Sequence, residues 1–488
     1  MERREEIRQN RIKKKEALEN SGHHSYPEKS KRTHKIEDCL SQFEDWEESG
    51  EEVRLGGRIR SLRGHGKLTF FTIEDESGSM QALVSENETG KRAYEFFARV
   101  FDIGDFIEIR GPLFHTKKGE KTLKVVDYKM LSKSVLPLPE KWHGLQSVEE
   151  RYRKRYLDLI VNKDQKEAFI KRSRIFKEMR SYLEEKDFLE VETPVLQPIY
   201  GGTAANPFKT HHNALDMELF LRIAPELYLK RLLVGGFEKV FEFARCFRNE
   251  GIDRSHNPEF TLLELYFAYA DYKDMMKLAE EMMSSVVEKV FGGTEIFYNE
   301  EKINFSGPFQ RIEFEDIIKK ETGLDINEMN KESLEEEAKK RGIDIEPGAG
   351  KAEICDEIFK EECRDKIRQP AFIIHHPYGF QPLAKSKEND ESKLSTFQLY
   401  VAGWEVMNGF SELNDPFEQR RRFEEQEKMK EEGFEEAQRM DEDFLEALEY
   451  GMPPAVGCGV GMDRLCAILT NSYSLREIIL FPTMRPKE

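Results

Sequence analysis

The segment from Lys239 to Tyr272 constrains the fold of this chain most, because its polarity alternates along two runs that a charged loop separates. In the first run, KVFEFARCFR, phenylalanines occupy one face and small or charged residues the other, as the two-residue period of a strand requires. The second run, EFTLLELYFA, alternates in the same way. The segment therefore predicts an antiparallel hairpin whose strands are joined by the loop NEGIDRSHNP.

This hairpin carries side chains whose chemistry suits a nucleotide and a cation. The guanidinium of Arg248 and the imidazole of His256 suit two phosphates. The ring of Phe260 suits a nucleobase, and the carboxylate of Glu264 suits a cation. The other interpretation is an ordinary core hairpin in which Arg248 and Glu264 form an internal salt bridge, and the pattern alone leaves both open.

A glycine-rich segment near the C-terminus, AVGCGVGMDRLCAIL, leads into a predicted helix. Its glycines, Gly457, Gly459 and Gly461, permit a ligand to approach the backbone closely. Arg464 lies in the first turn of the helix, where the helix dipole also favours an anion. Such an entry to a helix more often serves packing than phosphate binding, so it is weak evidence on its own.

Five β-like runs with a two-residue period lie between Val53 and Leu131, separated by turns that contain glycine. Five strands in so short a stretch suit a small barrel. An OB-fold, which binds oligonucleotides on the face of its second and third strands, is the leading prediction. A β-barrel without a nucleic-acid role is the alternative.

Composition indicates a globular cytoplasmic protein of two or three domains, with 488 residues of which 38% are hydrophobic and 35% charged. No run approaches the ~18 apolar residues of a membrane span. The charged N-terminus does not resemble a secretory signal, and the six cysteines show no metal-ligand spacing, which indicates a reducing compartment. We therefore expect a cytoplasmic location and no membrane.

The net charge of −18 does not exclude a nucleic-acid partner, because binding depends on where the charges lie. Residues 1–35 contain eleven Lys and Arg against six Glu. Within them, residues 2–20 predict an exposed charged helix with too few apolar residues for a buried face. This helix either contacts a polyanion or serves as a solubilising extension.

Three segments resemble the ordered motifs of the class II aminoacyl-tRNA synthetases. DFLEVETPVL resembles motif 1, FRNEG…HNPEF resembles motif 2, and the GxGxGxDR pattern resembles motif 3. From about residue 5 to Arg485 the resemblance is specifically to the lysyl-tRNA synthetases. Its most specific pieces are WHGL, RYRKRYLDLI, APELYLKRLLVGGFEKVFE, NGFSELNDP and ALEYGMPP.

The resemblance implies an α+β chain with an antiparallel-sheet catalytic domain of six or seven strands, preceded by an anticodon-binding OB-fold barrel. We expect a charged helical extension over 1–48, the barrel over 49–135, a linker over 136–160 and the catalytic domain over 161–488. A mainly polar, helical insertion is expected at about 315–366. Members of the family are typically homodimers built across motif 1.

The resemblance also implies the reaction, in which L-lysine is activated with ATP to lysyl-adenylate and transferred to the 3′ end of tRNA(Lys), with Mg²⁺ as cofactor. The implied catalytic residues are Arg248, Glu250, His256 and Arg464. These four bind ATP together with Asn257 and Phe260. The implied lysine site is Gly202, Glu226, Arg248, Glu264, Tyr266, Asn408 and Glu412. The implied anticodon contacts are Phe70, Arg63, Gln81, Glu120 and Arg58, and the implied Mg²⁺ ligands are Glu405 and Gln398.

Elementary chemistry agrees with this assignment. A lysine ammonium is a compact, strongly hydrated cation, so a desolvating pocket should supply more than one carboxylate, as Glu264 and Glu412 do. Activation needs positioning and charge stabilisation and no protein nucleophile. For Phe70 a core position is the alternative, because either Phe70 or Phe71 must face inward.

Gln398 departs from the family pattern, which usually has an acidic metal ligand at this position. An amide brings no charge, and Mg²⁺ prefers carboxylates and phosphates, so we expect weaker or rearranged Mg²⁺ binding.

Two other functions remain as alternatives. One is a paralogue that lysylates a protein; the known ones lack the anticodon barrel. The other is a non-catalytic nucleic-acid-binding or signalling protein, which would have no need of Arg248, Arg464 and Glu405 together.

Overall fold

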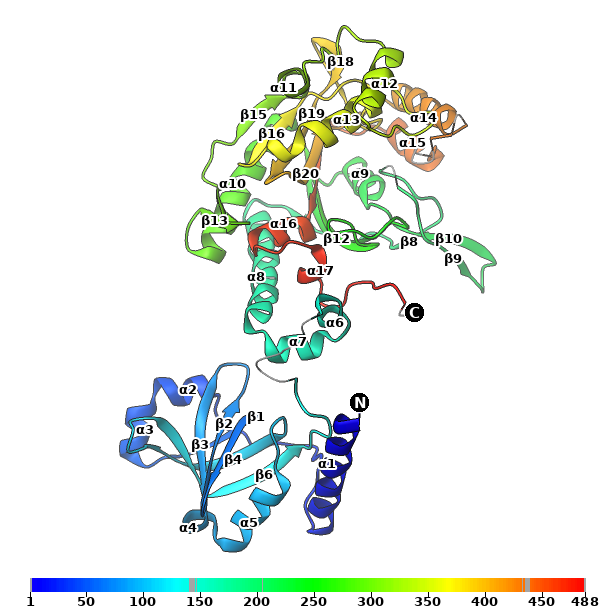
Figure 1. The fold of residues 1–488 in the computed structure, drawn as a ribbon. Helices are drawn as coiled ribbons and strands as arrows, with labels where there is room; N and C mark the ends of the chain where they lie inside the picture. Colours follow the sequence, from blue (N-terminus) through cyan, green and yellow to red (C-terminus); the bar gives the residue numbers. More distant parts are fainter. Residues whose placement is uncertain are drawn as a thin grey trace. The chain divides into compact units, whose positions relative to one another are not determined.

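The computed structural model describes residues 2–139, 145, 147–203, 205–431, 433–434 and 439–486. The chain forms two compact units, Met1–Leu145 and Gln146–Glu488 (Figure 1). The predicted linker, 136–160, and the WHGL signature lie partly outside the described residues. Within the described part, no helix is both long and apolar enough to cross a membrane.

The first unit contains a closed β-barrel. Strands β1, β2 and β3 form an antiparallel meander, β3 pairs with β5 in parallel, and β4 pairs with both β5 and β1, which closes the barrel. This confirms the predicted OB-fold. The strands are β1 Glu52–His65, β2 Leu68–Glu74, β3 Ser79–Ser85, β4 Phe106–His115, β5 Lys121–Val125 and β6 Asp127–Ser132.

The fifth predicted run divides at Val126 into β5 and β6, which both lie against β4. Gly111 makes this close crossing possible, because a Cβ there would collide with the backbone carbonyl of Lys124. Inward side chains alternate along the strands, as in Val53, Leu55 and Ile59. The helices of this unit are α1 Glu2–Asn20, α2 Ile36–Ser41, α3 Phe43–Ser49, α4 Glu86–Thr89 and α5 Lys91–Val100.

Residues 2–20 form the predicted helix, α1, and most of its side chains are exposed, but the prediction that the helix has no buried contact was wrong. Arg11 is buried, and its guanidinium donates hydrogen bonds to the carbonyls of Ile103, Ser134 and Leu136, each at 3.0 Å. Leu18 is buried as well. Charged and polar contacts therefore fix α1 to the barrel, because buried carbonyls need donors and arginine offers several.

The second unit is built on an eight-stranded sheet in the order β15-β16-β19-β20-β21-β12-β11-β7. All its pairings are antiparallel except β15 with β16 and β11 with β7. The sheet strands are β7 Leu189–Glu190, β11 Lys239–Phe247, β12 Glu259–Ala268, β15 Gln310–Glu313, β16 Ala371–Ile374, β19 Thr396–Val401, β20 Trp404–Ser411 and β21 Ala455–Gly461.

Helices cover both faces of this sheet. On one face α8 Lys163–Glu185, α10 Tyr272–Phe291 and α16 Met462–Leu469 form the largest core with alternate residues of the strands. On the other face α9 Glu226–Val234, α14 Pro416–Glu431 and α15 Glu442–Glu449 form a second core around Tyr266 and Phe410. Because the period of a strand is two, Leu265 faces the first core and Tyr266 the second.

The expected insertion is helical and has its own core, which packs against the sheet edge at Ile373 and Tyr400. It contains α11 Phe314–Thr322, α12 Lys331–Lys340, α13 Lys351–Glu362 and the 3-10 helix η1 Arg364–Lys366. The remaining elements are short: α6 Val148–Arg153, α7 Arg155–Val161, α17 Leu475–Ile478, β8 Leu196–Gln197, β9 Lys209–His212, β10 Met217–Leu221, β13 Glu295–Tyr298, β14 Glu301–Asn304, β17 Ser386–Lys387 and β18 Asp390–Leu394.

Candidate active site

The two segments that the sequence singled out are neighbours in the sheet. The hairpin forms as β11 and β12, with Glu242 opposite Glu264 and Cys246 opposite Phe260. Strand β12 also pairs with the glycine-rich β21, which in turn pairs with β20. The hairpin, the glycine-rich strand and β20 therefore form one continuous floor.

The glycines of β21 make room for carboxylates from neighbouring strands. A Cβ on Gly457 would collide with Oε1 of Glu412 and the ring of Tyr266. A Cβ on Gly459 would lie 3.1 Å from Oε1 of Glu264, which is tighter than ordinary contact. These close approaches show that both glycines serve the packing of buried acidic side chains.

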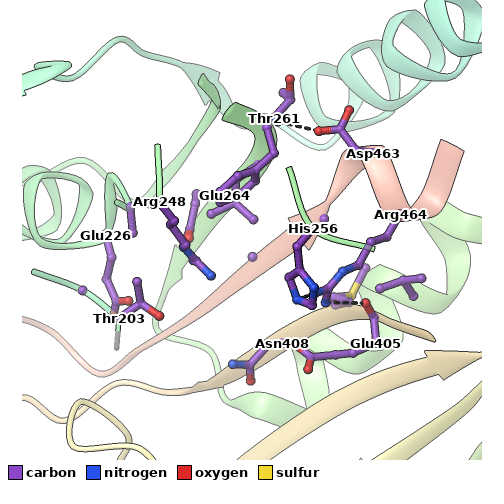
Figure 2. Close-up of a pocket in the computed structure, with 18 of the residues that line it drawn as sticks. Thr203, Glu226, Arg248, His256, Thr261, Glu264, Glu405, Asn408, Asp463 and Arg464 are labelled. Carbon is purple, nitrogen blue, oxygen red and sulfur yellow. Dashed lines mark hydrogen bonds between the residues drawn. The ribbon is translucent and has the colours of Figure 1, made fainter. Parts of the chain in front are cut away.

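A cleft lies over this floor. Figure 2 shows its labelled side chains around one space, with Glu226 toward the left end, His256 and Arg464 toward the right, and Arg248 between them. The structure brings twelve predicted site residues to the lining of this cleft: Gly202, Glu226, Arg248, Glu250, His256, Asn257, Phe260, Glu264, Tyr266, Glu405, Asn408 and Arg464. Of the predicted lysine and metal residues, Glu412 and Gln398 are not in the lining.

One end of the cleft is cationic. Arg464 donates from Nη1 to the backbone carbonyl of Glu405 at 3.2 Å, and its Nη2 lies 3.1 Å from Nε2 of His256. Nδ1 of His256 lies 2.8 Å from Oδ2 of Asp253. Although burial opposes it, hydrogen bonds from His256 and Ser255 lower the pKa of Asp253 to about 2. This carboxylate therefore stays ionised and fixes the loop between β11 and β12.

Arg248 has no acidic partner in the described part of the chain. Its guanidinium lies 5.0 Å from the centre of the Phe260 ring, and its Nε is buried without a hydrogen-bond partner. Glu264 instead accepts a hydrogen bond from the hydroxyl of Tyr266 at 3.1 Å. The internal salt bridge between Arg248 and Glu264, the alternative from the sequence, is absent from the described residues, and Arg248 is free to bind an anion.

The other end of the cleft is rich in buried carboxylates. Glu226, Glu264 and Glu412 are all buried. Burial raises the pKa of Glu264 and of Glu412 to about 8, and it also raises the pKa of Glu226. Such a group of acids is unstable in ionised form unless a cation joins it.

Lys230, which sequence reasoning missed, is a cation in this group. Its Nζ lies 2.6 Å from Oε1 of Glu226 and 2.5 Å from Oε2 of Glu412. Although burial opposes it, the two carboxylates raise the pKa of Lys230. The available signal was the i,i+4 spacing of Glu226 and Lys230 in APELYLKRLL, which on a surface helix would be an ordinary ion pair.

Asp463, also missed, joins the helix after β21 to the hairpin. Its Oδ2 accepts a hydrogen bond from the backbone N–H of Thr261 at 2.8 Å, drawn in Figure 2, and its Oδ1 lies 2.7 Å from Nη1 of Arg172. The neighbouring Arg464 is thereby held over the cleft. The signal was the DR pair at the start of the predicted helix.

Of the two predicted metal ligands, only Glu405 faces the cleft. The amide oxygen of Gln398 lies 3.0 Å from Nε2 of His376 and accepts a hydrogen bond from the hydroxyl of Tyr400 at 3.3 Å. Burial lowers the pKa of His376 to about 3, so this ring is neutral and its Nε2 donates to Gln398. With two donors on its oxygen, Gln398 does not fit a metal ligand in this arrangement, whereas the carboxylate of Glu405 does.

One group of described residues, Glu44, Glu47 and His115, has metal-ligating atoms within 4.8 Å of one another. It belongs to the barrel unit, where Nδ1 of His115 already pairs with Glu47 at 2.6 Å. The ring of His115 is therefore already engaged by a carboxylate at the surface of the barrel.

On the barrel, Phe70 is half-buried on the outer face of β2, while Phe71 lies in the core against Phe97. Arg63 is opposite Phe70 on β1, and Glu120 is exposed just before β5. Gln81 on β3 donates to Oγ1 of Thr122 at 2.9 Å. Phe70, Arg63 and Gln81 thus lie on the outer face of the barrel, and Glu120 lies at the edge of that face.

Arg58, the fifth predicted anticodon contact, lies apart from this group. It pairs in register with Glu74, four residues beyond Phe70 on β2. Its guanidinium stacks on the ring of Phe106 at 4.2 Å and donates to the carbonyl of Gly104 at 3.0 Å. The structure therefore does not bring Arg58 to the other four.

An antiparallel sheet with a cleft of this kind, coupled to an OB-fold barrel, defines a class II aminoacyl-tRNA synthetase. The comparisons agree: residues 147–485 match the family model of class II tRNA synthetases (D, K and N), and residues 53–131 match that of the OB-fold nucleic acid binding domain.

Similar proteins narrow the class to one family. The lysine–tRNA ligase of Carboxydothermus hydrogenoformans is 50% identical over 98% of this chain and 98% of its own length. Those of Syntrophomonas wolfei and Moorella thermoacetica are each 48% identical, over 99% and 98% of this chain and 97% of their own lengths. The chain therefore belongs to the lysine–tRNA ligase family.

Proposed function

We propose that this chain activates L-lysine with ATP to form lysyl-adenylate and pyrophosphate, and then transfers the lysyl group to the 3′ end of tRNA(Lys), releasing AMP. The observation that favours lysine as the substrate is a set of buried hydrogen-bond acceptors that lack donors. Oε1 of Glu412 and Oδ1 of Asn408 are buried and have no hydrogen-bond partner among the described residues. With the carboxylate of Glu264 they offer three acceptors, and an ammonium group offers three donors.

The energetic argument favours a cation in this space. A buried acceptor left unsatisfied costs roughly 1–3 kcal/mol, and more when it is charged. A ligand ammonium satisfies the acceptors and also balances the buried acids. We assign the side-chain ammonium of lysine to Glu264, Tyr266, Asn408 and Glu412. We assign the α-amine to Glu226 and Gly202, where a positive φ of 92° brings the backbone close to Glu226.

The cationic end suits ATP. We assign the α-phosphate and the lysine carboxylate to Arg248, the γ-phosphate to Arg464, and the outer phosphates to His256. The ring of Phe260 stacks on adenine, with Glu250 and Asn257 beside the nucleotide. Arg248 lies between the two ends of the cleft in Figure 2, which is where the reacting carboxylate and phosphate have to meet.

The first step needs no protein nucleophile. An oxygen of the lysine carboxylate attacks the α-phosphorus, the new P–O bond forms, and the bond to the pyrophosphate oxygen breaks. Arg248 and Arg464 stabilise the charge that spreads over the phosphates. Glu405 would hold Mg²⁺, which supplies neutralisation of the triphosphate charge when bound. A hydroxyl of the terminal ribose of tRNA then attacks the acyl carbon and forms an ester, the bond from that carbon to the phosphate oxygen breaks, and AMP leaves while the hydroxyl proton passes to a phosphate oxygen or to water.

For the tRNA anticodon we assign Phe70, Arg63, Gln81 and Glu120. Proteins recognise single-stranded RNA loops by stacking bases on accessible aromatic rings and by hydrogen bonds to base edges, and the half-buried ring of Phe70 lies among polar side chains that suit this. The barrel also argues against an acceptor protein in place of tRNA. Arg58 keeps only a supporting place in this assignment, since Phe106 and Gly104 already engage it.

We also infer a homodimer in the cytoplasm. The motif 1 segment and the residues just after it expose apolar side chains that a monomer would leave in water: Leu189, Val195, Leu196 and Ile199. Strand β7, in the same segment, lies at the edge of the eight-stranded sheet. An exposed apolar segment beside a sheet edge supports contact with a second copy.

Amino-acid-dependent ATP–pyrophosphate exchange, run with each of the twenty amino acids, tests the activation step. We expect exchange with L-lysine and none of comparable rate with the others. Exchange with another amino acid would contradict the assignment of the acidic end, and no exchange at all would favour a non-catalytic protein. Lysylation of a tRNA(Lys) transcript, with a tRNA of another specificity as control, then tests the acceptor.

A further inference from the structure

We propose that Lys230 is a positioning residue that fixes both amine subsites of the lysine pocket and sets the positive charge that the pocket accepts. This inference rests on the proposed function, because it concerns how L-lysine is held. Lys230 lies on α9, is 0% exposed, and is not among the residues that line the cleft. It therefore acts through its neighbours and does not touch the substrate.

Lys230 joins the two ends of the lysine site. Its Nζ bonds Oε1 of Glu226, which we assign to the α-amine, and pairs with Oε2 of Glu412, which we assign to the side-chain ammonium. The rings of Phe410 and Phe444, 5.3 and 5.9 Å from Nζ, enclose the ammonium group. One fixed cation thus determines the separation of two carboxylates that come from different elements.

The remaining oxygen of each carboxylate lies beside a glycine that lines the cleft. Oε2 of Glu226 lies 3.5 Å from the position that a Cβ on Gly202 would take, and Gly202 lines the cleft. Oε1 of Glu412 occupies the space of a Cβ on Gly457, another lining residue, and has no hydrogen-bond partner among the described residues. Lys230 therefore holds the outer oxygens and leaves the inner ones for a ligand.

The charges give Lys230 a second role. Three buried carboxylates, Glu226, Glu264 and Glu412, face one buried ammonium. With Arg248 assigned to the substrate carboxylate, two negative charges remain, one for each amine of L-lysine. Without Lys230 a third charge would have no partner, and one carboxylate would take up a proton instead.

The proton affinities agree with this count. Burial raises the pKa of all three carboxylates, and in each case Lys230 acts in the opposite direction. Removing the charge of Lys230 should therefore raise these pKa values further, so that the carboxylates ionise, as lysine binding requires, only at higher pH.

The test is Lys230→Met in the full-length enzyme, assayed by lysine-dependent ATP–pyrophosphate exchange across a range of pH. We expect the KM for lysine to rise about tenfold or more, which is at least about 1.4 kcal/mol of binding. The kcat and the KM for ATP should change by less than about threefold, because only amine binding is weakened. The pH dependence of the lysine KM should move toward alkaline pH by about one unit.

A matched control exists in the barrel unit. Lys133 is also 0% exposed in its side chain and lies between two carboxylates, 2.6 Å from Asp102 and 2.8 Å from Asp105. Lys133→Met should lower the melting temperature, because it leaves two carboxylates without their cation. It should leave the lysine KM and the pH dependence of that KM unchanged. A discrimination assay adds to this: the preference of Lys230→Met for lysine over ornithine, one methylene shorter, should fall.

A wild-type lysine KM and pH dependence in Lys230→Met would overturn the inference. So would a lower kcat with an unchanged pH dependence, since that indicates only less folded enzyme. If the variant does not fold, a crystal structure of the wild-type enzyme with L-lysine decides: Nζ of Lys230 must keep both carboxylates. Absence of lysine-dependent exchange in the wild type would instead contradict the proposed function as well.

Discussion

At the scale of single residues, the buried carboxylates make lysine binding a proton-linked event. In the empty pocket burial raises the pKa of Glu264 and of Glu412 to about 8, so both are mostly protonated near neutral pH. A bound ammonium favours the ionised form of both carboxyl groups, so binding should release about two protons per lysine at about pH 7. Calorimetric titration in two buffers of different ionisation enthalpy measures this number, and the lysine KM should fall between about pH 6 and about pH 8.

The raised pKa values of Glu264 and Glu412 affect stability in the opposite direction, because a rise in pH favours lysine binding and destabilises the empty enzyme. A carboxyl group whose pKa is raised in the folded state stabilises the empty enzyme fully below its unfolded value of 4.5, and this contribution is lost as pH rises toward about 8. Lysine should therefore raise the melting temperature more at about pH 8 than at about pH 6. Equal shifts at both pH values, or proton uptake on binding, would contradict the assignment of these two acids.

Gln398 gives a second prediction at this scale. In Gln398→Glu the new carboxylate would lie beside the buried ring of His376 and form an ion pair with it. Because the carboxylate is then engaged, the Mg²⁺ requirement should change by less than about twofold. Replacing His376 by Phe as well keeps a ring beside Phe380, which stacks at 4.3 Å, and frees the carboxylate. The Mg²⁺ concentration for half-maximal exchange should then fall about fivefold or more. An unchanged requirement in the double variant would show that position 398 does not influence the metal.

The sequence predicted the residues whose chemistry is explicit in a motif, such as Arg248 and Glu264, and the structure gathers them at one cleft. It could not predict Lys230, because a buried lysine and an exposed one look alike in a helical pattern. Nor could it predict that His376 engages Gln398, since that contact joins residues 22 positions apart. Non-local hydrogen bonds decide what a polar side chain is free to do.

At the scale of the elements, two adjacent residues of β2 have different roles: Phe70 is assigned to tRNA recognition, and Phe71 belongs to the barrel core. Phe70→Ala should raise the KM for tRNA about tenfold, because a stacked base contributes roughly 1–3 kcal/mol, while lysine activation stays unchanged. Phe71→Ala removes a core ring that is 1% exposed and should cost about 3–5 kcal/mol of stability. Exchange kinetics, tRNA charging and thermal unfolding of both variants measure these effects. An equal loss of stability in the two would place Phe70 in the core.

Elements with a clear local period were predicted well, and elements fixed by distant groups were not. In β1 to β4 and in the hairpin, the alternation of buried and accessible side chains follows from each strand's own residues. The docking of α1 depends instead on carbonyls more than 90 residues away, and this is why its composition suggested a free helix. The two-residue strands β7, β8 and β17 are too short to show a period.

At the scale of the whole molecule, the two units divide the work that the proposed function requires. The sheet unit contains every predicted ATP and lysine residue, and the barrel unit contains every predicted anticodon residue. Activation assays therefore report on the first unit and charging assays on both. The predicted domain boundaries remain predictions, because residues 140–144 and 146 lie outside the described part of the chain.

The homodimer is the prediction that concerns the assembled molecule. Leu196, on the motif 1 segment, is 47% exposed, and Leu196→Asp would place a charge in an apolar interface where it has no partner. Analytical ultracentrifugation at micromolar concentration should show the wild type as a dimer and this variant largely as a monomer. Phe417→Asp is the control, because Phe417 is 81% exposed at the start of α14 and its loss should leave the dimer intact. A wild type that sediments as a monomer would mean that the exposed apolar residues of motif 1 serve another contact.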